Sequence, residues 1–434
     1  MKKLSRKKRV DIVHVSYFLS FILLSFMTYL IVLNIGFVGA AVFNVGSQGE
    51  FDQGTYNNTE WSVDHVQLSS GNTEGTYTSE VFDVNNTAIW NNISWIKGAP
   101  YQEELPNAGA VEIDIGGANM SGNVLLMHMN EVSGDIIDYS GYGNDGLNRG
   151  GISYGVDGKF NDGLSFDGSN DWIQISDDSS LDITGDITIE AWIYPRDFSN
   201  QPDLITKGSY NQAYSIWVDS DGTVVFVING DSFSSVSGLN VDNWYHITVV
   251  KDGSNGYIYL DGAEDNSGNN VFDSAIQQGS YNLFVSTLDY PFDMIADEVS
   301  IFNRALSSTE VFDHYKRGSL RLNLTVRSCD DDACNGESWI DINDNSSQSL
   351  SLDDNQYFQY NYDFNTENLL YSPELYNVSI DYTMHALPDN SPTTTLLNPE
   401  NGSITDIKNV DFECNASDDI QLSNISFYWD YAGS

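Results

Sequence analysis

A short loop of carboxylate and amide side chains is the part of this sequence whose residue types most directly suggest ion chemistry. The segment Asp138-Tyr-Ser-Gly-Tyr-Gly-Asn144 places a carboxylate and an amide oxygen on either side of a turn. Ca²⁺ takes about six to eight oxygen ligands, and the glycines free backbone carbonyls to point inward. The loop is therefore a candidate calcium site. The alternative is that Asp138 and Asn144 accept hydrogen bonds from turn amides as Asx caps.

The elements that must position this loop are predicted to be strands. Most segments after residue 60 alternate apolar and polar residues, as in 224–228 and 376–383, with Gly, Asn and Asp between them. Alternation with turn residues at intervals of about 8 to 12 residues predicts antiparallel β-sandwiches. One helix is expected, because Ser307-Ser-Thr-Glu310 is a capping box and Gly318 is a C-terminal stop.

Six short motifs occur in order between residues 138 and 306. They lie at 138–146, 163–175, 187–195, 243–250, 256–262 and 296–306. Each motif alone is weak, but their order resembles the LamG-like jellyroll family of the concanavalin A-like lectin/glucanase group. The resemblance covers roughly residues 122–316 and implies an all-β fold with a jellyroll sandwich.

The resemblance also implies which residues hold the ion. In that family the loop equivalent to residues 138–144 lies near a terminal Asp-Glu-Val strand, which is matched here by Asp297. It therefore implies Asp138, Asn144 and Asp297 as ligands of a structural Ca²⁺. Glu131, which follows the first strand, is the candidate for a fourth ligand.

Exposed aromatic side chains near Asn, Asp or Gln are typical of carbohydrate binding. Candidates at strand ends or in loops are Tyr194, Tyr210, Tyr214, Trp217, Tyr290 and Phe292. Three tryptophans lie within alternating strands, where we interpret them as core residues: Trp172, Trp192 and Trp244. The identity of the ligand does not follow from this pattern.

A hydrolase must be weighed because glycoside hydrolases share this fold group and need paired carboxylates. Glu112 and Asp114 begin a Glu-x-Asp-x-x-Glu pattern, but two glycines follow and the segment precedes the jellyroll. Glu190 has no acidic partner two or four residues away. His128 and His246 lie on strands and are interpreted as packing residues. We therefore predict that these residues do not form an enzyme.

The charge of the chain excludes nucleic acid as a natural partner. There are 62 acidic and 18 basic residues, a net charge of -44. A phosphate backbone would be repelled by such a surface. The composition instead favours divalent cations and a solvated, extracellular environment.

The N-terminus is predicted to be a targeting segment. Basic residues at 2–9 precede an apolar run from Val13 to about Phe43. This order sends the remainder of the chain out of the cytoplasm. The run is long enough to span a bilayer, and small residues at 38–41 offer a cleavage site, so residues 1–44 are either a signal peptide or a membrane anchor.

Three cysteines fit an oxidising compartment. Cys329 and Cys334 lie in one acidic loop, and a disulfide between them is favoured over a metal site because further Cys or His ligands are missing. Cys414 is predicted to pair with a cysteine beyond Ser434.

The regions flanking the jellyroll contain too few strands to form a core separately. We predict one host β-sandwich, made from residues 47–121 and 317–386, in which the jellyroll of residues 122–316 is nested. The first strand of the jellyroll at 124–129 and its last strand at 298–302 would lie side by side. The two ends of the jellyroll would then be neighbours, so that it could be inserted with little distortion of the host. Asn-x-Ser/Thr sequons occur on both sides of the jellyroll and not within it.

The end of the sequence resembles the opening strands of an Ig-like domain. Residues 391–434 are too few for a complete one, so a longer protein is expected. The whole pattern predicts a surface-anchored or secreted adhesion protein that binds an extracellular glycan or a surface protein. The alternative is an accessory binding region of a larger secreted enzyme whose catalytic domain lies outside this chain.

Overall fold

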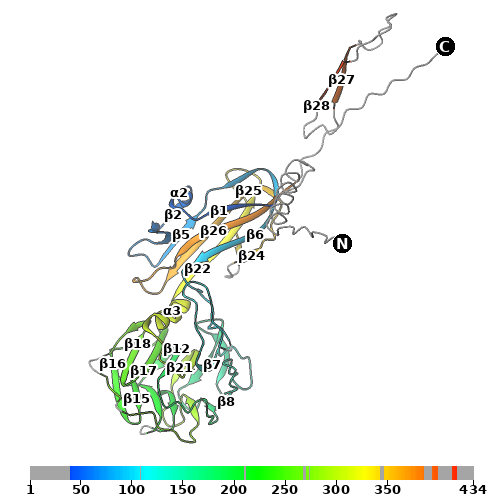
Figure 1. Ribbon diagram of the computed structural model, residues 1–434. Helices are drawn as coiled ribbons and strands as arrows, with labels where there is room; N and C mark the ends of the chain where they lie inside the picture. Colours follow the sequence, from blue (N-terminus) through cyan, green and yellow to red (C-terminus); the bar gives the residue numbers. More distant parts are fainter. Residues whose placement is uncertain are drawn as a thin grey trace, which may run out of the picture.

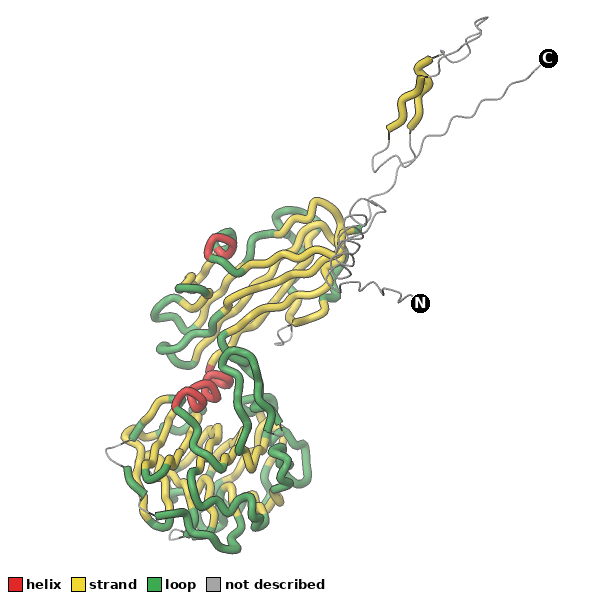
Figure 2. The backbone as a smooth tube through the Cα atoms, in the orientation of Figure 1, coloured by secondary structure: helices red, strands yellow, loops and turns green. Residues whose placement is uncertain are grey.

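The computed structural model arranges the chain in two strand-rich bodies with a helix at their junction (Figures 1 and 2). It describes residues 40–107, 109–209, 212–266, 270–272, 274–342 and 347–385, and two strands, β27 (Thr393–Asn398) and β28 (Glu413–Ser417). The predicted targeting segment before residue 40, and the predicted Ig-like part apart from these two strands, lie outside the described residues. Within the described part, no helix has the length and apolarity needed to cross a membrane.

The first body consists of two sheets that face each other across one core. The first sheet has the order β19 (Ala263–Glu264), β18 (Asn255–Leu260), β17 (Tyr245–Asp252), β12 (Ile187–Asp197), β21 (Asp293–Phe302), β10 (Asp162–Asp167) and β9 (Ser153–Asp157), and β7 (Asn123–Met127) also pairs with β21. The second sheet has the order β16 (Asp231–Gly238), β15 (Thr223–Ile228), β14 (Tyr214–Val218), β13 (Asp203–Lys207), β20 (Leu283–Val285), β11 (Trp172–Ile175) and β8 (Gly146–Arg149). All of their pairings are antiparallel, as predicted.

The alternation of side chains along each strand decides which of them enter the core. In β12, Ile189 and Ile193 face the second sheet and belong to the large buried cluster. Glu190 and Trp192 point to the opposite face of the sheet, because successive side chains alternate. They are nevertheless buried, since helix α3 (Ser308–Ser319) covers that outer face. The first sheet is therefore buried on both faces along β12.

The jellyroll closes through its first and last strands. Met127 of β7 pairs with Val299 of β21, and Leu125 pairs with Ile301. The prediction that these two strands lie side by side is confirmed. Entry to and exit from the jellyroll are consequently neighbours, at the end that faces the second body (Figure 1).

The second body is an eleven-stranded sheet system with its own core. Its strands are β1 (Ala40–Val45), β2 (Thr55–Asn57), β3 (Thr59–Ser62), β4 (His65–Leu68), β5 (Glu74–Thr78), β6 (Phe82–Lys97), β22 (Leu320–Cys329), β23 (Ile340–Ile342), β24 (Ser347–Ser349), β25 (Asn355–Thr366) and β26 (Leu375–Met384), and the short helix α2 is Gln48–Phe51. β25 lies between β5 and β6, and β26 lies between β6 and β4. Yellow and orange strands therefore lie among blue and cyan ones in Figure 1. Strands from before and after the jellyroll thus share one sheet.

The boundary predicted at residue 44 differs from the structure. Ala40–Val45 forms β1, which pairs with residues 378–383 of β26. Phe43 stacks on the Tyr382 ring at 5.0 Å and lies 4.9 Å from the Phe82 ring. The end of the apolar run is therefore a strand, because its alternate side chains cover the core of the second body.

Helix α3 begins as predicted and ends later than predicted. The capping box is present, since Ser307 and Glu310 bond each other's backbone amides. Gly318 lies inside the helix and is not its terminating residue. Its lack of a side chain serves packing, because a Cβ there would lie 2.6 Å from Cζ2 of Trp192.

We expect Gly318→Ala to destabilise the chain. The added methyl group would clash with Trp192 and lie 3.0 Å from Cε of Lys159. Overpacking of this kind costs about 1–3 kcal/mol. Chemical denaturation measures the change in the free energy of unfolding, with Gly185→Ala as the control because a Cβ there meets no heavy atom within 4 Å. Equal stability of the two variants would contradict this role of Gly318.

Candidate functional site

A groove of about 710 Å³ lies on the outer face of the second sheet of the jellyroll. Strands β11, β13, β14 and β20 form its floor. In β11, Trp172 and Gln174 face the groove while Ile173 and Ile175 face the core. The same alternation places Trp217 of β14 and Phe284 of β20 on the groove side. The strand pattern therefore builds a row of aromatic side chains on a rigid floor.

Loop residues complete the groove. Leu288 and Tyr290 precede β21 and line it with exposed fractions of 56% and 51%. Gln201 also lines the groove and donates a hydrogen bond to Asp219. The groove thus combines exposed apolar surface with amide and carboxylate groups. Such a combination can both stack on a ligand and hydrogen-bond to it.

The groove carries negative charge. Asp203, Asp219 and Asp289 line it, and none of its described lining residues is Lys, Arg or His. Burial raises the pKa of Asp203 to about 6, and repulsion by Asp289 adds to this, while the hydrogen bond that Thr287 donates at 2.8 Å opposes it. Asp203 consequently takes up a proton in the mildly acidic range.

Only part of the predicted aromatic set lies at the groove. Trp217 and Tyr290 line it, whereas Tyr214 and Phe292 are core residues. Tyr194 packs against Trp244, with ring centroids 5.8 Å apart. The remaining candidate, Tyr210, lies outside the described residues.

The interpretation of Trp172 as a core residue was wrong, because it lies in the groove. The alternation along this strand could have predicted the position of Trp172, since its neighbour Ile173 is a core residue. The period of two along β11 puts Trp172 and Ile173 on opposite faces. Trp192, by contrast, is buried as expected, under helix α3.

Asp138 organises its own loop. Its Oδ1 accepts hydrogen bonds from the backbone N–H groups of Leu126 and Ser140, at 3.0 and 2.9 Å. Its Oδ2 accepts from the Ser140 hydroxyl and the Asn144 N–H, both at 2.8 Å. Asn144 in turn donates through Nδ2 to the carbonyl of Val124 at 2.8 Å. These are the bonds that the Asx-cap alternative describes.

The other two predicted calcium ligands lie in separate hydrogen-bond networks. Glu131 accepts from the N–H of Ile137 at 2.9 Å. Asp297 is fully buried and accepts from the N–H groups of Phe160 and Glu298. The described residues contain one group of three acidic, His or Cys ligand atoms within 4.8 Å of one another, and it is Glu104, His128 and Glu298. Calcium ligation at the predicted residues stays a prediction.

The acids weighed for hydrolysis have structural partners. Glu112 accepts from Arg317 Nη1 at 2.8 Å and from the N–H of Ala118 at 2.7 Å. Glu190 is buried beside two histidines, with His314 Nδ1 at 3.0 Å and His246 Nε2 at 3.6 Å. Burial opposes ionisation of Glu190, but the two histidines outweigh it and hold the pKa of the carboxyl below its usual range.

The two histidines interpreted as packing residues do more than pack. His246 is the second partner of Glu190, and His128 forms ion pairs with Glu104 and Glu298. No local pattern could predict these partners, since Glu190 and His314 are 124 residues apart and His128 and Glu298 are 170 apart.

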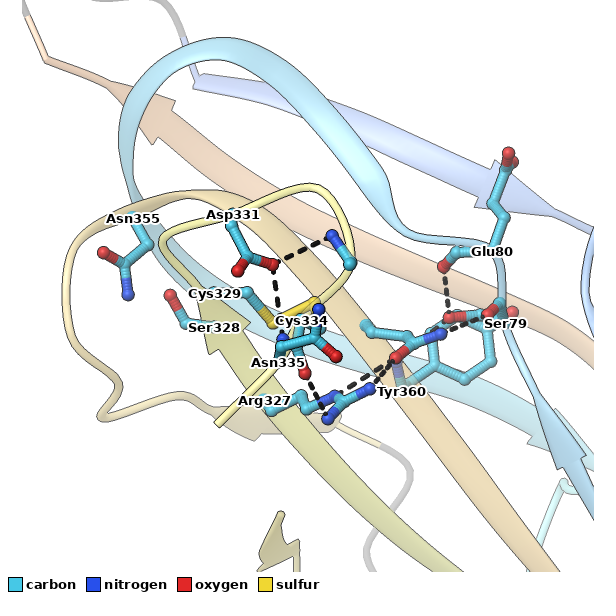
Figure 3. Close-up of a disulfide and its surroundings, with 12 residues drawn as sticks. Ser79, Glu80, Arg327, Ser328, Cys329, Asp331, Cys334, Asn335, Asn355 and Tyr360 are labelled. Carbon is cyan, nitrogen blue, oxygen red and sulfur yellow. Dashed lines mark hydrogen bonds between the residues drawn. A yellow bond between two sulfur atoms is a disulfide. The ribbon is translucent and has the colours of Figure 1, made fainter. Parts of the chain in front are cut away.

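The predicted disulfide is present at the end of β22. Cys329 and Cys334 are joined, with their Cα atoms 5.1 Å apart (Figure 3). Arg327 donates to the carbonyl of Cys334 at 2.8 Å and through Nη2 to Gln359 Oε1 at 2.6 Å, which ties the loop to β25. The disulfide therefore shapes the loop after β22, as expected.

Several solved structures are similar to this chain. The binding domain of Paraclostridial Mosquitocidal Protein 1 is 20% identical, with 48% of this chain and 61% of that chain covered and a TM-score of 0.39. The receptor binding domain of botulinum neurotoxin C/D mosaic serotype is 14% identical, with coverages of 48% and 57% and a TM-score of 0.38. The botulinum neurotoxin serotype C1 binding domain is 16% identical, with coverages of 46% and 52% and a TM-score of 0.38. This chain thus covers less than two thirds of each.

No curated protein sequence matches the chain. A family model does match, over residues 167–312, and its description is "Concanavalin A-like lectin/glucanases superfamily". The matched part begins at the last residue of β10 and ends in α3, so it contains the strands from β11 to β21 and all of the residues that line the groove, but not β7, β8 or β9. The resemblance drawn from the six motifs is confirmed: over residues 167–312 the jellyroll is similar to the concanavalin A-like lectin/glucanase superfamily.

Proposed function

We propose that this chain is an extracellular or cell-surface binding protein that holds a carbohydrate in the groove of its jellyroll. The observation that carries the proposal is the row formed by Trp172, Trp217 and Phe284 on the outer face of the second sheet, with Tyr290 at its edge. The match of residues 167–312 to a superfamily of lectins and glucanases supports it.

The chemistry of the groove suits a sugar ring. A pyranose offers an apolar C–H face and equatorial hydroxyls, so it needs flat aromatic surface and hydrogen-bonding groups together. Gln174, Gln201 and Asp203 supply amide and carboxylate groups beside the rings. Because the strands beneath them pair with one another, the backbone that carries the rings is ordered before a ligand arrives.

The charge of the groove narrows the class of sugar. Its carboxylates at Asp203, Asp219 and Asp289 would repel sulfate, phosphate or sialic acid groups. We therefore propose a neutral glycan as the ligand. A protein partner would bind to the same surface. If the chain is an accessory region of a larger secreted enzyme, it would also bind its ligand through this groove. The chain itself is proposed to be non-catalytic.

The second body is proposed to present this jellyroll at the cell surface. Residues 47–121 and 317–386 would be a host sandwich for the nested domain at 122–316, which the shared sheet and core of their strands support. The disulfide and the net charge of -44 support an extracellular setting. Attachment through the N-terminal apolar segment, and an Ig-like domain from residue 391, complete this proposal.

We expect Trp217→Ala to weaken glycan binding by about tenfold or more, because truncating a central aromatic contact has an effect of this size. Binding to a glycan array, followed by calorimetry on the best neutral glycan, measures the change. Tyr142→Ala is the control, since Tyr142 is an exposed aromatic residue in a loop that does not line the groove. Binding that is lost in neither variant, or equally in both, would contradict the groove as the site.

We expect Asp203→Asn to stabilise the chain at pH 8 and to have little effect near pH 4. The folded-state pKa of about 6 lies above the ordinary value of 3.8. The favourable contribution of protonated Asp203 is therefore complete below about pH 3.8 and is lost as the pH rises through 6. The two-unit shift corresponds to about 2–3 kcal/mol.

Thermal melting between pH 4 and pH 8 tests this expectation. The control is Asp221→Asn, because hydrogen bonds from Thr223 lower the pKa of Asp221. That variant should not gain stability at pH 8. A pH profile of Asp203→Asn that parallels the wild type would contradict the buried, proton-binding state of Asp203.

Calcium binding by Asp138, Asn144, Asp297 and Glu131 is a separate proposal with its own test. We expect Ca²⁺ to raise the melting temperature of the metal-free chain, because an ion that binds only the folded state stabilises it. Asp138→Ala should remove this dependence on Ca²⁺. A melting temperature that Ca²⁺ leaves unchanged would contradict the proposal and favour the Asx-cap alternative, in which Asp138 only accepts its four hydrogen bonds.

A further inference from the structure

His128, Glu104 and Glu298 bring one nitrogen and two carboxylate oxygens together at the junction of the two bodies. One ligand atom from each of the three lies within 4.8 Å of the other two. His128 Nδ1 hydrogen-bonds with Glu298 Oε1 and lies 3.8 Å from Glu104 Oε2. We propose that this cluster binds a divalent transition-metal ion, with Zn²⁺ as its best match.

The tautomer of His128 is the first argument. Its Nε2 lies 2.7 Å from Asn107 Oδ1, so Nε2 carries the proton and donates it to that carbonyl oxygen. Nδ1 faces the two carboxylates, so it either carries a second proton, which makes the ring cationic, or binds a metal ion through its lone pair. Three acceptors facing one another need a positive charge between them. A metal ion supplies that charge, and a proton is the competing occupant that the experiment below must separate.

Each ligand is also anchored through an atom that does not face the cluster. Glu298 Oε2 accepts from the N–H of Leu105 at 3.0 Å, and Glu104 Oε1 accepts from Asn161 Nδ2 at 2.6 Å. The ring of His128 packs against Tyr139 at 4.7 Å. Hydrogen bonds that orient metal ligands from outside are typical of metal sites in proteins. The remaining ligand atoms of His128, Glu104 and Glu298 therefore face one another.

The charge balance of the site favours a dication. Two carboxylates share one imidazole as their ion-pair partner. Glu298 is 2% exposed and its neighbour Asp297 is fully buried. Buried carboxylates are commonly paired or bound to metal because an unpaired buried charge is costly.

The backbone of β21 is shaped to build this site. Glu298 has a φ of +49°, and the pairing of β21 with β12 shifts register between Glu190 and Trp192. This bulge inserts one residue, so Asp297 and Glu298 both leave the core face that Ala296 and Val299 occupy. A regular strand would have sent one of the two acids into the apolar core.

The ligand set selects the metal. One imidazole nitrogen and two carboxylate oxygens suit Zn²⁺, whose bonds to such atoms are about 2.0–2.2 Å long. Ca²⁺ would need more oxygen ligands than these three residues provide. The side chain of Glu104 is 23% exposed, so an ion can reach the site from solvent.

The location suggests what the ion would do. Glu104 lies in the segment that connects β6 of the second body to β7 of the jellyroll, whereas His128 directly follows β7 and Glu298 lies in β21. A bound ion would fasten the connecting segment to the jellyroll. It would therefore stiffen the junction of the two bodies, far from the aromatic groove.

Zinc binding by the purified full chain tests the proposal. Metals are first removed from the chain, and Zn²⁺ is then added together with excess Ca²⁺. We expect elemental analysis to find about one bound Zn²⁺ per chain. The melting temperature should rise by about 5 °C or more when free Zn²⁺ is near 100 times its dissociation constant. His128→Gln and Glu104→Gln should each abolish both effects.

The control is Glu103→Gln, because Glu103 is adjacent in sequence but pairs with Lys97 at 2.8 Å. It should bind Zn²⁺ as the wild type does. Glu104→Gln is the variant that decides, since Glu104 is the most exposed of the three ligands and circular dichroism can verify that it folds. No Zn²⁺ bound by the wild type, which would mean that a proton alone holds the cluster, or equal Zn²⁺ in wild type and Glu104→Gln, would overturn the proposal.

Discussion

Strand β21 is the element on which the jellyroll and its junction with the second body depend. Its first half pairs with β10 and its second half with β7, while β12 runs along its other edge. Backbone hydrogen bonding on both edges leaves little freedom in register, so the bulge at Glu298 is held by its neighbours. As the last strand of the jellyroll, β21 therefore closes the domain by pairing with the first strand, β7, and it also directs two acids to the outer face.

The outer faces of the two sheets have opposite environments, and this difference locates the proposed functions. Helix α3 and the segment after β6 cover the first sheet, so its outward acids and histidines must find partners inside the protein. Within the described residues no such cover lies over β11, β13, β14 and β20, and the outward aromatic side chains of the second sheet line an open groove. Ionic interactions consequently stabilise the junction, and the proposed glycan recognition belongs to the exposed face.

The predictions that succeeded depend on short-range patterns. Alternation predicted the strands, the capping box of Ser307 and Glu310 marked the start of α3, and the spacing of Cys329 and Cys334 predicted their disulfide. The predictions that failed depend on contacts between side chains that are far apart in the sequence. Gly318 was interpreted as a helix stop although it makes room for Trp192, which comes from a strand 126 residues earlier.

The all-β class and the pairing of the first and last strands of the jellyroll could be predicted from the amino-acid sequence, because they follow from periodicity and from motif order. It also offered Trp217 and Tyr290 as aromatic candidates. Three features became visible only in the folded chain: Trp172 lies on the groove side, Asp138 accepts hydrogen bonds from its own loop and from Leu126 of β7, and His128 meets Glu104 and Glu298. Sheet pairing, bulges and covering helices bring distant residues together, and local patterns carry no information about such contacts.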